Sequence, residues 1–241
     1  MPRGGPDYKN PDYALAAAIP DVGALIVPMR GVAPIDGLGR IWFMDTFGQG
    51  LSAWRTFVTG AGVLACASIQ YAQVAPASAC LETGPTPATD SSFMTYLVLP
   101  SGSSHQGIEL GVKYGSGMPD TTVFLDIVVG ANLVKGKFTL FPAAGVLRLF
   151  LGVGYVDLPI LLAGTGNIYW MTLKLVLDAS VPAYVRLIYG PYSMDLSAYA
   201  PALVAFNPAV AVHGVNISGA PSDYASQFLY VGHVILTADE P

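Results

Sequence analysis

The sequence predicts an all-β protein, a two-sheet antiparallel sandwich of jelly-roll type, and three observations predict it. The 241 residues include 27 Gly and 19 Pro, which would interrupt the helices of a bundle too often. Hydrophobic residues make up 53% of the chain and charged residues only 11%, whereas disordered chains are rich in charge and poor in aromatic rings. Short apolar runs separated by turn residues follow one another from Ile41 to the end, as in sandwiches and jelly rolls.

The first forty residues differ from the rest and predict an extended N-terminal arm. Six Pro and six Gly are spread through residues 1–40, which leaves room for one short helix at most. The segment nevertheless carries apolar side chains that a solvated linker would not need. An arm lying along a neighbouring chain explains both features, and so does an arm packed on its own domain. The candidate contact residues are Leu15, Ile19, Leu25, Ile26 and Val27.

From residue 41 to residue 241 the chain is expected to form one sandwich domain. The predicted strands are Ile41–Phe47, Gly62–Tyr71, Ala79–Thr83, Met94–Leu99, Gly107–Tyr114, Thr122–Val129, Phe138–Phe141, Val146–Phe150, Trp170–Asp178, Ala183–Tyr189 and Phe228–Thr237. In Trp170–Asp178 the leucines 173, 175 and 177 alternate with Thr172 and Lys174, so the leucines should face the core and the polar residues should face away from it.

Two cysteines lie in the two arms of one predicted hairpin. Cys66 and Cys80 would face each other across a turn near residue 73, so a disulfide is geometrically possible. The N-terminus shows no signal peptide, so we expect synthesis in a reducing cytoplasm and two buried thiols instead.

The order of features along the chain resembles a known family. A strand with Trp42, Asp45 and Phe47 precedes the segment Gly50–Trp54. Further segments are Cys80–Thr83, Tyr169–Asp178, Tyr184–Leu187, Asp195–Ser197 and Val234–Thr237. Over residues 41–241 this succession resembles the concanavalin A-like (laminin G-like) jelly rolls, and among them the structural proteins encoded by bacteriophages.

The resemblance implies that the first and last strands pair and that the Trp strand packs against the Tyr strand that follows it. Calcium-binding members hold the ion with acidic residues on the first and last strands. Asp45 matches the first position, but Gly232 and His233 stand where an acidic pair would be needed. Calcium prefers six to eight oxygen ligands, so we expect no calcium site, no other metal and no cofactor.

No catalytic constellation is apparent in the sequence, and we expect a protein that is not an enzyme. His105, His213 and His233 are far apart and lack metal-ligand spacing. A pair formed by Glu82 and Glu109 is the alternative, because glycosidases use two facing carboxyl groups. Asp126 lies within an apolar run, and the period of two predicts that it faces outward.

Charge and hydropathy exclude two kinds of partner. A net charge of −5 argues against nucleic acid. No stretch offers the roughly 20 consecutive apolar residues of a membrane-spanning helix. Tyr189 and Tyr192, at an expected exposed tip, are candidate partner-binding residues, because rigid tyrosine rings are enriched at interfaces.

These observations favour a virion structural protein, a capsid decoration or minor capsid protein. It would be made in the host cytoplasm and would bind the major capsid protein and copies of itself. The alternative is a carbohydrate-binding or lectin-like domain on a phage tail or fibre, since sugars also stack on exposed aromatic rings.

Overall fold

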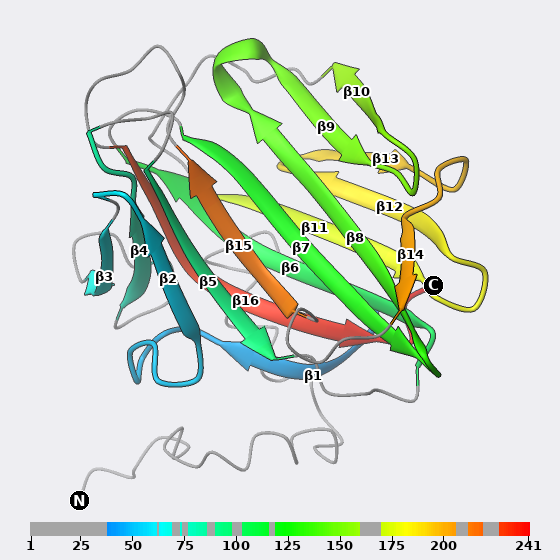
Figure 1. Cartoon of the computed structure of the whole chain (residues 1–241). Coiled ribbons are helices and arrows are strands. Elements are labelled where there is room, and N and C mark those ends of the chain that lie inside the picture. Colours follow the sequence, from blue (N-terminus) through cyan, green and yellow to red (C-terminus); the bar gives the residue numbers. More distant parts are fainter. Residues whose placement is uncertain are drawn as a thin grey trace, which may run out of the picture.

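The computed structural model is a sandwich of two antiparallel β-sheets, here called sheet A and sheet B (Figure 1). The structure describes residues 38–61, 63–68, 73, 77–85, 90–97, 103–115, 119–159, 170–205, 212–218 and 227–241. The predicted fold class is therefore confirmed. The single helical element among these residues is a 3-10 turn, Pro142–Ala144. None of them forms a helix that is long and apolar enough to cross a membrane.

Sheet A has the strand order β13-β12-β11-β6-β16-β4-β3, and β1 also pairs with β16. Its strands are β1 (Arg40–Asp45), β3 (Val63–Ser68), β4 (Ser78–Glu82), β6 (His105–Tyr114), β11 (Met171–Asp178), β12 (Ala183–Tyr189), β13 (Tyr192–Asp195) and β16 (Phe228–Ala238). The first described strand thus lies beside the last one, with Asp45 opposite Val234. The Trp170 segment leads into β11, which pairs with β12. Both relationships are those that the family resemblance implies.

Sheet B has the order β10-β9-β8-β7-β15-β5-β2, and β14 also pairs with β8. Its strands are β2 (Arg55–Thr59), β5 (Ser91–Leu97), β7 (Asp120–Val129), β8 (Asn132–Phe141), β9 (Val146–Phe150), β10 (Tyr155–Pro159), β14 (Ala202–Ala205) and β15 (Val212–Ser218). In Figure 1, β7, β8 and β15 of sheet B lie in front of the strands of sheet A.

The core lies between the two sheets and follows the predicted alternation. Leu173, Leu175 and Leu177 are fully buried in it, as expected, because successive side chains of a strand point to opposite faces. Sheet B contributes fully buried side chains such as Phe138 and Leu140 from the other layer.

The hairpin of β3 and β4 forms as predicted, but its register differs by one residue. Cys80 lies opposite Ala65 rather than Cys66, because a bulge between Ala65 and Ser68 shifts the pairing. Cys80 is a buried free thiol, and desolvation by burial raises its pKa to about 11, so it stays protonated and unreactive at neutral pH. The side chain of Cys66 lies outside the described residues.

Candidate functional site

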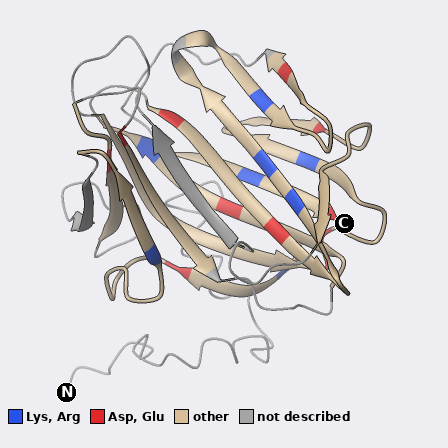
Figure 2. Ribbon diagram, in the orientation of Figure 1, with Lys and Arg blue, Asp and Glu red and all other residues tan. Residues whose placement is uncertain are grey.

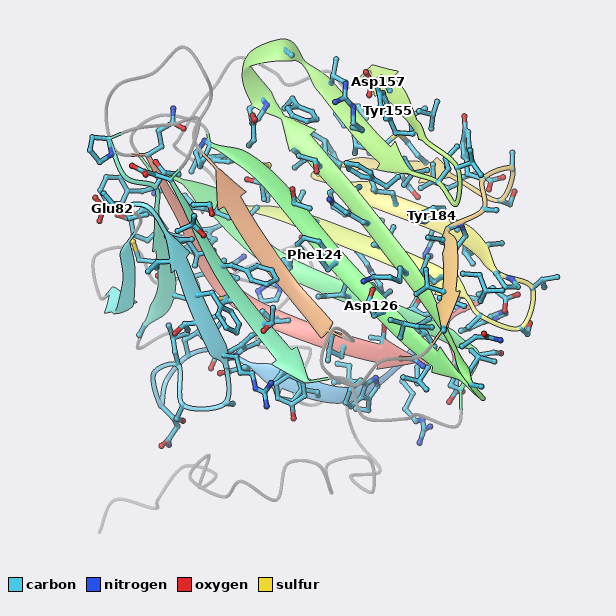
Figure 3. All side chains as sticks on the ribbon, in the orientation of Figure 1. Glu82, Phe124, Asp126, Tyr155, Asp157 and Tyr184 are labelled. Atoms are coloured by element: carbon cyan, nitrogen blue, oxygen red, sulfur yellow. The ribbon has the colours of Figure 1, made fainter. Side chains whose placement is uncertain are left out.

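The outward face of sheet B carries a row of aromatic side chains. Val123, Leu125 and Ile127 of β7 point into the core, so Phe124 and Asp126 face away from it. Figure 3 labels both, and it labels Tyr155 on β10, nearer the edge of the same sheet. We call Phe57, Phe93, Phe124, Phe150 and Tyr155 the aromatic row.

The rings of the aromatic row contact one another from β2 inward. The ring centroids of Phe57 and Phe93 lie 6.1 Å apart, and those of Phe93 and Phe124 lie 5.4 Å apart, edge to face. Strand β15 runs between the strands of Phe93 and Phe124, and its Gly214 pairs with Phe124. Glycine has no side chain, so residue 214 itself puts nothing between the two rings.

A lysine continues the row from β7 to β9. Lys137 of β8 lies opposite Phe124 of β7, and its ammonium nitrogen lies 5.5 Å from the Phe124 ring centroid and 4.0 Å from that of Phe150. The negative face of an aromatic ring attracts such a cation. Phe150 in turn lies 6.4 Å from Tyr155, so rings and cation form one continuous line across the sheet.

An arginine–carboxylate fork stands at the β10 end of the row. Arg148 donates from Nε to Asp157 Oδ1 at 2.7 Å and from Nη2 to Oδ2 at 2.9 Å. These hydrogen bonds lower the pKa of Asp157 below its usual value, which keeps the carboxylate charged. The guanidinium carbon lies 4.1 Å from the Tyr155 ring centroid and 4.9 Å from that of Phe141, so both rings contribute to the orientation of Arg148.

Two more polar pairs face outward near the middle of sheet B. The hydroxyls of Thr122 and Thr139 lie 2.7 Å apart. Asp126 is 1% exposed, and its Oδ2 lies 3.8 Å from Lys135 Nζ. Asp126 therefore faces away from the core, as its period-two pattern predicts, but is buried beside a lysine. Figure 2 shows basic residues on β8 and β9, between the acidic residues on β7 and β10.

A tyrosine of sheet A supports the row from inside the core. Tyr184 of β12, labelled in Figure 3, is fully buried, and its hydroxyl contacts the backbones of β8 and β9. It accepts a hydrogen bond from the backbone N–H of Lys137 at 3.0 Å and donates to the carbonyl oxygen of Phe150. Burial raises the pKa of Tyr184, so the hydroxyl keeps its proton. The backbone positions of the cation and of its neighbouring ring are thus tied to the opposite sheet.

The outward face of sheet A carries a chain of buried polar groups. His233 Nδ1 lies 3.0 Å from Gln73 Oε1, and His233 Nε2 lies 3.7 Å from Glu109 Oε1. Lys174 Nζ lies 3.6 Å from Glu109 and 2.8 Å from Glu240. Lys174 faces away from the core, as predicted, and yet it is fully buried. Because these groups are closed off from solvent, their arrangement suits holding strands together better than binding a ligand.

The carboxylates considered as a glycosidase pair are too far apart. Glu82 lies opposite Phe228, whereas Ile235 lies opposite Glu109. Seven residues along β16 correspond to about 23 Å, whereas glycosidases place their two carboxyl groups roughly 5–9.5 Å apart. The two residues do not form a catalytic pair.

The residue that matches a calcium ligand of the resembled family has protein partners. Asp45 accepts hydrogen bonds from the backbone N–H of Phe47 and from the indole of Trp54, each at 2.7 Å. Among the described residues no cluster of His, Cys, Asp and Glu has the arrangement of a metal site. The Asp45 side chain therefore stabilises the turn that follows β1.

The candidate partner-binding residues fall in three different places. Tyr192 is 47% exposed at the turn into β13, as expected for a tip. Tyr189 is 5% exposed and belongs to the core, so its ring is closed to a partner. The arm residues 15, 19, 25, 26 and 27 lie outside the described residues.

Sequence reasoning did not single out the aromatic row. Phe57 and Tyr155 are 54% and 56% exposed, but they lie in β2 and β10, two strands that the apolar-run pattern did not predict. The available clue lay in β7, since Phe124 is two residues before Asp126 and so shares the face that the period of two assigns to Asp126, away from the core.

Comparison with known proteins supports the fold. No family model and no curated protein matches the sequence. A solved structure titled "Cellulose induced protein, Cip1" is similar with a TM-score of 0.53 and 14% identity, over 81% of this chain and 96% of that one. One titled "Sialidase" is similar with a TM-score of 0.50 and 11% identity, over 84% of this chain and 19% of that one. The chain thus spans about a fifth of the sialidase. At these identities the likeness shows a shared β-sandwich fold, and fold alone does not define function.

Proposed function

We propose that the protein is a carbohydrate-binding β-sandwich domain that holds glycans on the outward face of sheet B without cleaving them. The observation that carries the proposal is the aromatic row, which joins strands β2 to β10 and has exposed rings at both ends. Ring faces stack on the C–H faces of sugars, while the neighbouring polar groups supply hydrogen bonds to hydroxyls.

The charges of this face favour binding over hydrolysis. Asp126 and Asp157 are each paired with a cation, and their strands are three steps apart in the sheet. Three steps correspond to about 14 Å, beyond the roughly 9.5 Å that separates the carboxyl groups of an inverting glycosidase. The names of the two similar structures, "Sialidase" and "Cellulose induced protein", agree with a role near sugar polymers.

The test is a glycan array followed by calorimetry on the glycans that bind. Tyr155→Ala and Phe57→Ala should each weaken binding roughly two- to twelvefold, because a well-placed aromatic contact contributes about 0.5–1.5 kcal/mol. Tyr192→Ala is the matched control, since it removes an equally exposed ring from sheet A. The proposal fails if no glycan binds, or if Tyr192→Ala weakens binding as much as the two variants in the row.

The capsid-decoration hypothesis depends on the arm, of which residues 1–37 lie outside the described residues. It stays a prediction, as does placement on a phage tail or fibre. The carbohydrate alternative has the support of described side chains.

A further inference from the structure

Resting on the proposed function, we infer that the aromatic row binds an acidic glycan, an extended chain of pyranose rings that carry carboxylates, and that Lys137 receives one of those carboxylates. The inference comes from the charges on the outward face of sheet B and from the length of the row.

Lys137 is the unneutralised cation at the centre of the row. Arg148 is paired with Asp157, and Lys135 with Asp126. Within the described ranges Lys137 has no carboxylate partner. Its ammonium is instead held between the rings of Phe124 and Phe150, where a sugar stacked on the row would meet it.

The other charges of this face do not compensate Lys137. Asp120 begins β7 and lies four residues before Phe124, the partner of Lys137, which places it about 13 Å away along the strand. Desolvation by burial also raises the pKa of Asp120 to about 6, so its carboxylate is protonated more readily than that of an ordinary aspartate. Arg55, exposed in β2, adds a second positive charge towards the other end of the row.

The surroundings of Lys137 destabilise its charged form, so a bound anion would stabilise it. Burial and the nearby Lys135 lower the pKa of Lys137, because neither low polarity nor a like charge favours the ammonium form. A carboxylate beside it would form a charge-assisted hydrogen bond, which is roughly twice as strong as a neutral one. Anionic ligands should therefore gain more from this position than neutral ligands of the same shape.

The length of the row fits a chain rather than a single sugar. Six strand-to-strand steps separate β2 from β10, and steps of about 4.8 Å add up to about 29 Å. A ligand that uses both Phe57 and Tyr155 must cross the strands and span several sugar units. At the β10 end, Arg148 still has N–H groups beyond the two that bind Asp157, and these can donate to glycan hydroxyls.

The experiment compares acidic oligosaccharides with their neutralised forms by calorimetry. The probes are oligogalacturonate, oligoalginate and hyaluronan fragments, with methyl-esterified oligogalacturonate as the neutral match. At least one acidic probe should bind the full chain at least about tenfold more tightly than the ester, since a hydrogen bond to a charged group contributes about 1.5–3 kcal/mol. This preference should shrink as salt rises, because exposed charges are screened.

Lys137→Met removes the charge and keeps an unbranched side chain. It should abolish the preference for the acidic probe, because the affinity for that probe falls much more than the affinity for the neutral ester. Lys113→Met is the matched control, because Lys113 lies between the core residues Val112 and Tyr114 of β6 and so faces away from the core on sheet A. It should change neither affinity.

Three outcomes separate this inference from the proposed function. Equal binding of acid and ester, or an unchanged preference in Lys137→Met, overturns the inference while the carbohydrate function stands. If neither acidic nor neutral glycans bind, the inference and the proposed carbohydrate function are both wrong. If poly-aspartate binds in place of every glycan, the face is a docking surface for an acidic protein, and both fall as well.

Discussion

The ammonium of Lys174 lies 2.8 Å from Oε1 of Glu240, and both side chains are fully buried. Glu240 is the penultimate residue of the sequence, and its other oxygen accepts a hydrogen bond from Arg186 Nη2 at 2.7 Å. The hydroxyl of Thr237 also donates to Glu240. The last residues of the chain thus tie β16 to β11 and β12 through charges away from the hydrophobic core.

Lys174→Met should destabilise the protein strongly. The change would leave Glu109 and Glu240 near each other without the cation between them, and losing one partner of a buried ion pair costs about 3–5 kcal/mol. Urea unfolding followed by circular dichroism measures the loss. Arg40→Gln is the control, because Arg40 and Asp239 form an exposed pair, and such pairs contribute little. Equal losses in the two variants would show that the Lys174 pair is not buried in solution.

Tyr184→Phe should reduce both stability and glycan affinity. Without the hydroxyl, the backbone N–H of Lys137 and the carbonyl of Phe150 lose their partner in the core, which costs about 1–3 kcal/mol and lets the cation and the ring shift. Tyr114→Phe is the matched control, because it removes another buried hydroxyl, one bonded to Thr121. The control should lose stability alone. A Tyr184 variant with unchanged affinity would mean that this residue does not position the row.

Much of the fold could be predicted because local alternation encodes it. Strands β9 and β12 have the bounds that their apolar runs predict, and the leucines of β11 fill the core as their period of two requires. The unpredicted strand β2 shows why other strands were missed. All five of its residues are exposed, so it has no buried face to produce a pattern, and its pairing with β5 holds it in place.

The candidate site could not be predicted in the same way, because register between strands distant in the sequence creates it. Phe124 stands between two apolar neighbours and looks like part of one buried run. Only the pairing of β7 with β8 puts Lys137 against it. The burial of Lys174 has the same origin, since its partner Glu240 lies 66 positions further along the chain.

The ion pair of His105 and Asp178 should make stability depend on pH. His105 Nε2 lies 2.9 Å from Asp178 Oδ2, and Nδ1 lies 2.9 Å from the carbonyl oxygen of Glu240. The hydrogen bond to Asp178 raises the pKa of His105, since Asp178 and the Glu240 carbonyl both accept hydrogen bonds from the charged ring. This stabilisation is fully present below the unfolded pKa of about 6.5 and is lost as the pH rises through the higher folded pKa.

Asp178 limits the same effect on the acid side. Burial opposes its ionisation, but hydrogen bonds from Ser180 and His105 outweigh burial and lower its pKa. Its contribution is therefore present above the unfolded pKa of about 3.9 and fades as the pH falls through the folded value. Urea midpoints from pH 5 to pH 9 should decline on the alkaline side in the native sequence and less steeply in His105→Gln. Identical slopes would rule out the pair as the cause.

Deleting residues 2–37 tests the arm hypothesis and is expected to separate folding from assembly. The deletion stops before Leu38, because the carbonyl oxygen of Leu38 accepts a hydrogen bond from Lys174 at 3.3 Å. A Pro-rich, apolar segment loses little chain entropy when it docks on a neighbour, so the arm should hold copies of the chain together. We expect the shortened chain to keep its urea midpoint and to run as a monomer in size-exclusion chromatography with light scattering, while the full chain runs as an oligomer. If both forms have the same oligomeric state, the arm does not link copies of this chain.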